Sequence, residues 1–327
     1  MPTRRRVTIS LLAMGFTAAG PAFAQTEGTL HLAAIGGGSP MTPDSRQGKM
    51  LLGALAALGY SLGNNLVFEA RGAKADNGKL PSLIVELKAQ GARILIASGY
   101  PSAVAAKDAG VPTVVFVGVG DPVETGLVES WAHPGGTITG ISDLAGTLTI
   151  KRLELLKAFS PKLKKIAMLW NPDNRAMTLR YQASAATAQL QGFVVQPLGV
   201  REPDDFNGAF EAMDRDTPDA ILMVADSLTI LNRKRVFDYA AARRLPAIYE
   251  SDFFTHEGGL MSYGADERES LTRAASMIDR IFKGARPGDI PFETPAKYVF
   301  SFNLKTARAM GVEPPVTLLG LADDVIE

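Results

Sequence analysis

The same order of strands and helices occurs twice in this chain, and this repetition constrains the fold more than any other feature. Apolar, β-branched runs that predict strands alternate with helical patterns over residues 30–119 and again over residues 165–250. Ile35 and Trp170, which end the first strand of each unit, are 135 positions apart. Strands that alternate with helices predict parallel sheets with right-handed crossovers. We therefore expect an α/β protein with two lobes built on the same plan.

The predicted elements can be assigned by residue range. Strands are expected over residues 30–35, 66–70, 93–97, 113–119, 165–170, 193–198, 219–224, 247–250 and 296–303. Helices are expected over residues 45–58, 80–90, 103–109, 178–190, 205–213, 233–244 and 304–310. A strand and a helix of about 18 residues after Gly258 are expected to return to the first lobe. The first lobe is accordingly placed at residues 28–142 plus 260–292, and the second lobe at residues 143–259 plus 293–327.

The segment 113–144 leads from the first unit into the second. Its apolar strand stops at Asp121, and the later loop His133-Pro134-Gly135-Gly136 suits a change of chain direction. Open α/β sheets bind ligands beyond the carboxyl ends of their strands, so Asp121 is a candidate ligand contact. Asp is also a common capping residue, and a helix cap at a strand-to-helix turn is an equally good interpretation.

The composition is that of a globular protein large enough for two domains. The chain has 327 residues, of which 46% are hydrophobic and 21% are charged. Lys plus Arg and Asp plus Glu number 34 each, so the net charge gives no indication of nucleic-acid binding. There is no cysteine, which excludes disulfides, thiolate metal sites and a cysteine nucleophile.

The first residues have the layout of a secretory signal. Arg4, Arg5 and Arg6 precede an apolar segment, residues 7–19, and the sequence Ala22-Phe23-Ala24 follows. This pattern predicts a signal peptide over residues 1–24 with cleavage after Ala24, by either the general or the twin-arginine route. The apolar segment is short for a membrane span, and no cysteine follows for lipid attachment. We therefore expect a free, soluble protein of the periplasm.

Residue types and spacings argue against several other classes of protein. His31, His133 and His256 are the only histidines and have no metal-binding spacing, and no G-x-S-x-G motif is present, so we expect neither a metal site nor catalytic residues. The loop 36–38, three glycines, matches neither G-x-G-x-x-G nor a P-loop, so no nucleotide cofactor is expected. A signal in place of an N-terminal helix-turn-helix argues against a DNA-binding regulator, and we expect no nucleic-acid partner.

Several stretches of the chain resemble one known family. In order, they are GDPVETGLVESWAHPGGTITGIS, KRLELLK, IAMLWNP, GGLMSYG and FNLKTARAMGVEPP. These stretches are similar to the ABC-transporter substrate-binding proteins of the tryptophan and tyrosine transport type, which are type I periplasmic binding proteins. The resemblance runs from about Leu30 to Glu327 in the family's order.

The resemblance implies a Venus-flytrap fold, in which two Rossmann-like lobes with parallel sheets are joined by a three-crossing hinge. It further implies a monomer without cofactor or catalysis, which binds a small-molecule ligand and delivers it to an inner-membrane ABC permease. The expected ligand is small and amphipathic, with aromatic amino acids among the candidates. A sensor module that presents its closed state to a membrane receptor would have the same fold and stays an alternative.

Candidate ligand-binding residues follow the strands at the edge where the two lobes would face each other. Polar groups for a ligand head group are Ser39, Ser98, Gly99, Tyr100, Ser102, Asn171, Asn174, Asp226 and Ser227. Free N–H groups of helix N-termini after Pro101 and near Asn174 would suit a carboxylate, and Asp121 or Asp226 would suit an ammonium group. Ser, Asn and Asp also cap helices, so each of these residues has a structural alternative.

Aromatic residues at the same edge would suit a flat ligand. Trp170, Tyr249 and Tyr263, together with Tyr100, are candidates for stacking, and Trp170 at the end of its strand is the most suggestive. Phe253 and Phe254 are expected in the core. The glycine loop 36–38 replaces the more aliphatic loop expected in amino-acid-binding relatives, so the sequence leaves the solute open.

Overall fold

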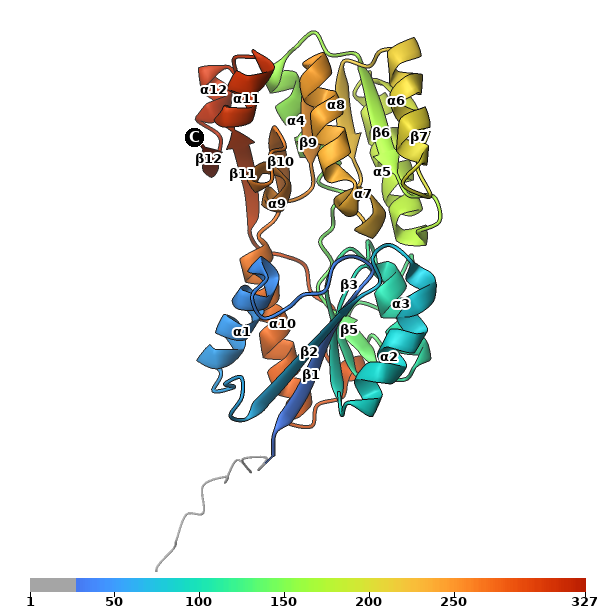
Figure 1. Cartoon of the computed structure of the whole chain (residues 1–327), viewed down its shortest axis with the longest axis vertical. Helices are drawn as coiled ribbons and strands as arrows, with labels where there is room; N and C mark the ends of the chain where they lie inside the picture. Colours follow the sequence, from blue (N-terminus) through green and yellow to red (C-terminus); the bar gives the residue numbers. More distant parts are fainter. Residues whose placement is uncertain (1–27) are drawn as a thin grey trace, which may run out of the picture.

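The computed structural model describes residues 28–327, and the expected signal peptide with its cleavage site lies outside the described residues. Two lobes are stacked along the long axis of the molecule (Figure 1). The first contains a five-stranded sheet and the second a seven-stranded sheet. No helix in the part of the chain that the structure describes is long and apolar enough to cross a membrane.

The first lobe is a parallel sheet with helices on both faces. Its strands are β1 (Leu30–Gly36), β2 (Leu66–Gly72), β3 (Ile94–Ser98), β4 (Thr113–Val117) and β5 (Ile138–Gly140), in the order β2-β1-β3-β4-β5. One apolar cluster joins a face of the sheet to α1 (Arg46–Ala57) and α10 (Glu267–Phe282). Another joins the opposite face to α2 (Leu80–Ala89) and α3 (Tyr100–Asp108), and the short helices η1 (Asn77–Lys79) and η2 (Pro287–Asp289) complete this lobe.

The second lobe has the same layers around a longer sheet. Its strands are β6 (Lys165–Trp170), β7 (Val194–Gly199), β8 (Ala220–Met223), β9 (Ala247–Tyr249), β10 (Met261–Ala265), β11 (Tyr298–Asn303) and β12 (Asp324–Ile326). One face packs on α4 (Thr149–Phe159), α5 (Arg175–Leu190), α11 (Leu304–Met310) and α12 (Val316–Leu319). The other face packs on α6 (Asp205–Arg215), α8 (Arg233–Arg243) and the short helices α7 (Ser227–Leu231) and α9 (Asp252–His256).

The strand orders confirm that the two lobes share one plan. The first five strands of the second lobe run β7-β6-β8-β9-β10, which is the order β2-β1-β3-β4-β5 of the first lobe. The second sheet then continues through β11, which pairs antiparallel with β10, and β12, which pairs parallel with β11. Helix ends also follow the sequence signals, since Gly59 and Gly192 have φ angles of 94° and 82°, which favour glycine.

The structure corrects the expected return to the first lobe after Gly258. β10 pairs with β9 and β11 and therefore belongs to the second sheet, whereas the division by sequence gives residues from 260 onward to the first lobe. The chain returns to the first lobe after β10, at α10, whose apolar side packs against α1 and β4. An alternating sequence pattern predicts that a strand exists. It does not predict which strands pair with it, because pairing depends on residues distant in the sequence.

Three crossings connect the lobes, as the resemblance implies. They lie between β5 and α4, between β10 and α10, and between η2 and β11. The first and third lie side by side, because the N–H of Ser142 donates to the carbonyl of Glu293 at 2.9 Å. The second and third also touch, because the N–H of Asp266 donates to the carbonyl of Lys297 at 2.9 Å. The hinge is therefore a bundle of hydrogen-bonded segments.

Candidate functional site

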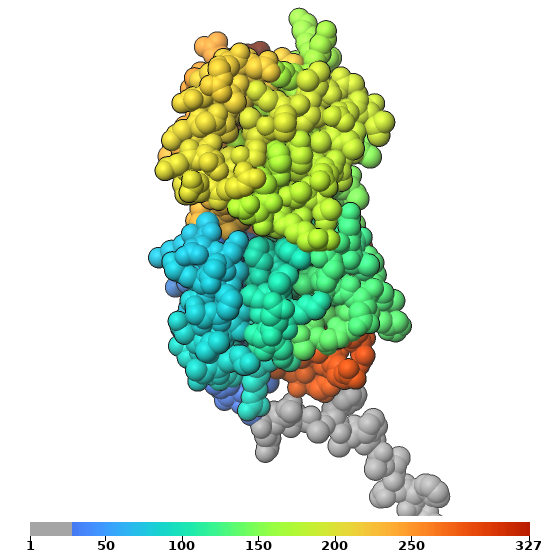
Figure 2. All heavy atoms as spheres, turned by 90° about the vertical axis from the view of Figure 1, so that its right-hand side faces the viewer, coloured from blue at the N-terminus to red at the C-terminus, as the bar shows by residue number. Residues whose placement is uncertain are grey.

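A cavity of about 390 Å³ lies between the two lobes, where the carboxyl ends of their parallel strands face each other. Its walls come from the loop after β1, the start of α1 and the ends of β3 and β4 in the first lobe, and from the starts of α5, α7 and α9 in the second. Figure 2 shows the atoms of the two lobes in contact on the side that it faces. A cavity of this size and position suits a small organic molecule.

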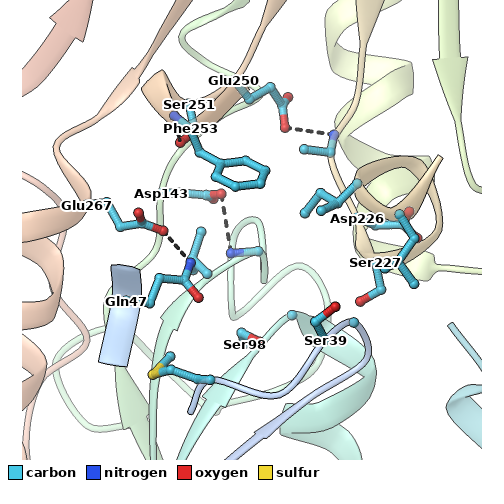
Figure 3. Close-up of a pocket in the computed structure, with 18 of the residues that line it drawn as sticks. Ser39, Gln47, Ser98, Asp143, Asp226, Ser227, Glu250, Ser251, Phe253 and Glu267 are labelled. Carbon is cyan, nitrogen blue, oxygen red and sulfur yellow. Dashed lines mark hydrogen bonds between the residues drawn. The ribbon is translucent and has the colours of Figure 1, made fainter. Parts of the chain in front are cut away.

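Three serine hydroxyls form the polar part of the cavity. Ser39 follows β1, Ser98 ends β3 and Ser227 begins α7, and Figure 3 shows them close to one another at one side of the cavity. None of the three hydroxyls has a hydrogen-bond partner within residues 28–327. All three are therefore available to a ligand. They come from both lobes, so a ligand bound to all three would hold the lobes together.

Backbone groups of the glycine loop complete this polar part. The carbonyls of Gly36, Gly37 and Gly38 accept hydrogen bonds from the segment after β2, which leaves the loop fixed in place. The N–H groups of Gly38 and Ser39 have no backbone or side-chain acceptor within the described residues. Free N–H groups beside three hydroxyls form a favourable environment for a carboxylate.

Asp226 lines the cavity, but other groups already satisfy its carboxylate. Its Oδ1 accepts from the N–H groups of Leu228 and Thr229 at 3.0 Å each, which caps α7. Its Oδ2 accepts from the amides of Asn171 at 2.8 Å and Asn174 at 3.5 Å. Asp226 therefore fixes the position of the neighbouring Ser227. Its contacts are those of a helix cap, the alternative role expected from the sequence.

A chain of buried charges forms part of the cavity wall. Arg180 donates to Glu250 at 2.7 Å and to Asp143 at 2.8 Å, and Arg152 approaches the other oxygen of Glu250 at 3.4 Å. Burial lowers the pKa of Arg180, but the charges of Asp143 and Glu250 outweigh it and raise that pKa above its ordinary value. Burial lowers the pKa of Arg152 despite the attraction of Glu250. Two positive and two negative groups therefore neutralise one another here.

A second ionic cluster joins the start of α1 to the other lobe. Arg46 forms an ion pair with Asp252 of α9, and its Nη1 lies 3.5 Å from a carboxylate oxygen of Glu267. Gln47 also donates to Glu267, a contact drawn in Figure 3. Burial raises the pKa of Glu267, although the hydrogen bond from Gln47 and the charge of Arg46 act in the opposite direction. None of these four residues is a candidate from the sequence pattern.

Phe253 forms the apolar wall. Its ring projects into the cavity in Figure 3, opposite the serines, and the guanidinium of Arg233 lies over the ring, 5.0 Å from its centre. Phe254 is 1% exposed and stacks on Tyr249 in the core of the lobe, with ring centres 5.2 Å apart. The expectation that both phenylalanines are core residues is confirmed for Phe254 and holds in part for Phe253, which packs against the same core cluster and also lines the cavity. The position of Phe253 just beyond the carboxyl end of β9 could have indicated from the sequence that this residue lies at the ligand site.

Six of the thirteen residues expected from the sequence line the cavity. They are Ser39, Ser98, Gly99, Asn174, Asp226 and Ser227. Asn174 is notable because its Oδ1 is buried and lacks a hydrogen-bond partner within residues 28–327. No group of three or more His, Cys, Asp or Glu side chains that could hold a metal ion occurs in the same range.

The other seven lie outside the cavity. Tyr100 donates to the carbonyl of Thr125 at 3.1 Å, and Asp121 caps its own turn by accepting from the N–H of Val123 at 2.8 Å. Trp170 stacks on Tyr181 with 3.7 Å between ring centres and is not among the residues that line the cavity. Ser102, Asn171 and Tyr249 are buried within their lobes, and the half-buried Tyr263 stacks on Tyr298 with ring centres 6.2 Å apart.

Comparisons with known proteins agree on one family. The model of a family described as ABC transporter substrate binding protein matches residues 42–326. The tyrosine-binding protein of Clostridioides difficile strain R20291 is 27% identical over 268 residues, which are 81% of this chain and 76% of that protein. These matches confirm the resemblance inferred from the sequence.

Solved structures show the same fold. A conserved domain protein from Vibrio cholerae has a TM-score of 0.83 at 22% identity, covering 91% of this chain and 99% of that chain. An ABC domain from Streptococcus pneumonia in complex with L-Trp has a TM-score of 0.79 at 23% identity, covering 91% of this chain and 100% of that chain.

Proposed function

Because the chain belongs to the family of ABC transporter substrate-binding proteins, we propose that it is a periplasmic receptor that encloses a small amphipathic ligand between its lobes. It would then deliver this ligand to an inner-membrane ABC permease. It acts by binding, without chemical conversion of the ligand. The observation that carries this proposal is the cavity itself, which has polar groups from both lobes on one side and an aromatic wall on the other.

The polar side supports binding of a carboxylate. The hydroxyls of Ser39, Ser98 and Ser227 and the free N–H groups beside them offer several hydrogen bonds in a partly enclosed space. A carboxylate bound by several such donors needs no arginine partner. The guanidinium of Arg180, which also lines the cavity, is already engaged by two acidic side chains.

The remaining walls support a ligand that also has a positive group and an apolar body. Charged side chains of the cavity pair with one another, so a positive group of the ligand would be bound by a neutral acceptor. The free Oδ1 of Asn174 is an acceptor for an ammonium group. Phe253 offers a ring face to an aromatic side chain. Aromatic amino acids combine these three features, and the names of two similar proteins mention tyrosine and L-Trp.

Closure is the mechanism that this arrangement supports. Only a state in which both lobes touch the ligand can use hydroxyls from the two lobes together, so the ligand favours that state. A dissociation constant near 1 μM corresponds to about 8 kcal/mol. A few hydrogen bonds and one enclosed ring are sufficient for a value of that size.

Thermal denaturation of the protein from Gln25 onward tests the proposal. The panel contains L-tryptophan, L-tyrosine, L-phenylalanine, aliphatic amino acids, benzoate and sugars, and the protein is first unfolded and refolded to remove any carried ligand. A ligand at about 100 times its dissociation constant adds about 2.7 kcal/mol to stability, which gives a clear rise in Tm. A rise with aromatic amino acids supports the proposal. No rise with any compound would contradict the ligand class.

A further inference from the structure

The two lobes meet across the cleft at a glycine. Gly37 lies in the loop after β1, and Ser227 is the first residue of α7 in the other lobe. A Cβ atom on Gly37 would lie 2.5 Å from Oγ and 3.2 Å from Cβ of Ser227. Non-bonded carbon atoms prefer separations of about 3.5–4.0 Å, so a side chain at position 37 would collide with the second lobe.

The need for glycine arises from this contact and from no requirement of the backbone. The φ angle of Gly37 is outside the positive range that favours glycine, so alanine could adopt the same conformation. The same Cβ would also meet Oδ1 of Asn77 at 2.8 Å, but that amide ends a flexible side chain of the same lobe and can rotate. The Cβ of Ser227 cannot rotate away.

Neither neighbouring glycine has this relationship to the second lobe. A Cβ on Gly36 would meet Oγ of Ser98, which belongs to the same lobe, at 2.5 Å. A Cβ on Gly38 would lie 3.8 Å from Oγ and 3.9 Å from Cβ of Ser227, which are ordinary contacts. Of these three residues, Gly37 alone has a steric restriction that exists only while the lobes are together.

Both sides of the contact are fixed within their own lobes. The carbonyl of Gly37 accepts from the N–H of Ala75 at 2.7 Å, which holds the loop. On the other side, Asp226 accepts from two N–H groups of α7 while Thr229 accepts from the N–H of Asp226 at 2.8 Å, which holds the helix start. A larger residue at position 37 would therefore keep the lobes apart instead of deforming either one.

We propose that Gly37 sets the limit of lobe closure through its contact with Ser227, and thereby sets the affinity of the cavity for its ligand. Gly37 does not line the cavity, so it is a positioning residue that acts through Ser227. With the lobes held apart, the hydroxyl of Ser227 could not reach a ligand that is bound to Ser39 and Ser98. The link to affinity rests on the proposed function, whereas the limit on closure does not.

An engineered disulfide measures closure without any ligand. In the variant with Gly38→Cys and Ser227→Cys, the two Cβ atoms would lie 3.9 Å apart, within the range of about 3.5–4.5 Å that disulfides need. The chain contains no cysteine of its own, so only this bond can form within one molecule. Its rate of formation under a fixed concentration of oxidant, followed by mass and by gel mobility, reports how often the closed arrangement occurs.

Substitutions at position 37 in this background test the inference. Gly37→Ala is expected to slow disulfide formation by about threefold to tenfold, and Gly37→Val by more than about tenfold, because both overpack a fixed contact. The same substitutions at Gly53 serve as controls, since a Cβ there meets no atom within 4 Å. They should leave the rate unchanged. The thermal unfolding of each reduced variant is measured as well, and the position 37 variants should unfold at or above the Tm of their parent.

Each outcome decides the question. Slower disulfide formation with an unchanged Tm supports a role in closure that a merely structural residue would not have. Equal rates with glycine, alanine and valine at position 37 would overturn the inference, as would failure of the disulfide to form with Gly37 intact. The ligand panel is a separate experiment, so a protein that binds none of its compounds loses the proposed function without affecting this result.

Discussion

The guanidinium of Arg180 forms two hydrogen bonds, of 2.8 and 3.0 Å, with the carboxylate of Asp143. Arg180 belongs to α5, whereas Asp143 lies in the first crossing and also accepts from the N–H of Gly118 in the first lobe at 3.3 Å. The pair therefore joins the hinge to both lobes beside the ligand cavity. Because Arg180 is only 4% exposed, the loss of a partner would leave a buried positive charge less well compensated.

Asp143→Asn is the first prediction. The amide keeps the shape of the side chain but removes its charge, while Glu250 still pairs with Arg180. We expect the free energy of unfolding to fall by about 1–3 kcal/mol, measured by urea denaturation. Asp204→Asn is the control, because Asp204 is exposed and has no ion pair within residues 28–327. Equal values for the two variants would show that the charge of Asp143 contributes nothing.

The two adjacent phenylalanines give a second prediction. Phe253→Ala should weaken the binding of an aromatic ligand by about tenfold, since its ring faces the cavity, and should lower stability less than the change at Phe254, since the ring is only half-buried. Phe254→Ala should lower the free energy of unfolding by about 3–5 kcal/mol, since its ring is buried against Tyr249. Calorimetric titration and urea denaturation of both variants separate the roles. A large loss of stability in Phe253→Ala would place that ring in the core.

Trp170→Ala tests whether Trp170 lies in the ligand site, as the sequence predicts, or outside the cavity, as in the structure. From the sequence, the expectation is weaker ligand binding with an intact fold. In the structure Trp170 stacks on Tyr181 and does not line the cavity, so the substitution should leave the dissociation constant unchanged. It should also lower the free energy of unfolding by about 1–3 kcal/mol through the lost ring contacts. A clear rise in the dissociation constant would show that Trp170 contributes to ligand binding, as the sequence predicts.

Much of the fold was predictable because it follows from local patterns. The eight strands expected before residue 251 all occur, and β1 and β6 match their expected ranges to within one residue. Short elements were missed: β5 has three residues, and α7 and α9 have five each. Their stability comes from caps and tertiary contacts, so they leave little periodicity in the sequence.

The site was harder to predict because a residue type states what a side chain can do and not which way it faces. Ser98 ends β3 and Ser102 comes four residues later, yet only Ser98 lines the cavity, because α3 begins at Tyr100 and carries Ser102 into the core. Arg180 could not be found at all from periodicity, since a buried arginine on a helix depends on acidic partners far away in the sequence. The contact between Gly37 and Ser227 also joins residues that are far apart in the sequence, so no local pattern predicts it.

Tyr239 gives a prediction about pH. Burial raises the pKa of Tyr239 to about 12, and its hydrogen bond to Asp214, of 2.8 Å, acts in the same direction. The unfolded chain loses this proton near pH 10, so between about pH 10 and 12 the folded state binds more protons and its stability falls as the pH rises. Solvent screening limits the effect to about 1 kcal/mol. Tyr239→Phe should show a shallower decline in urea denaturation across that range. Identical slopes would contradict the prediction.

Asp226 and Ser227 are neighbours for which the structure predicts opposite phenotypes. Ser227→Ala removes a hydroxyl that has no partner within the described residues, so stability should stay within about 0.5 kcal/mol. The same change should weaken ligand binding by about tenfold, the value of one hydrogen bond. Asp226→Ala removes the cap of α7 and leaves Asn171 without its acceptor, so the free energy of unfolding should fall by about 2 kcal/mol.

Asp226→Ala should also weaken binding, because the start of α7 that positions Ser227 loses its cap. The double variant separates this indirect effect from a direct contact. If Asp226 acts only through Ser227, the alanine at position 226 adds little to the loss of affinity once Ser227 is already alanine. If the two losses of affinity add fully, Asp226 contacts the ligand itself, as an ammonium partner would. Isothermal titration of the two single variants and the double variant with the same ligand decides between these roles.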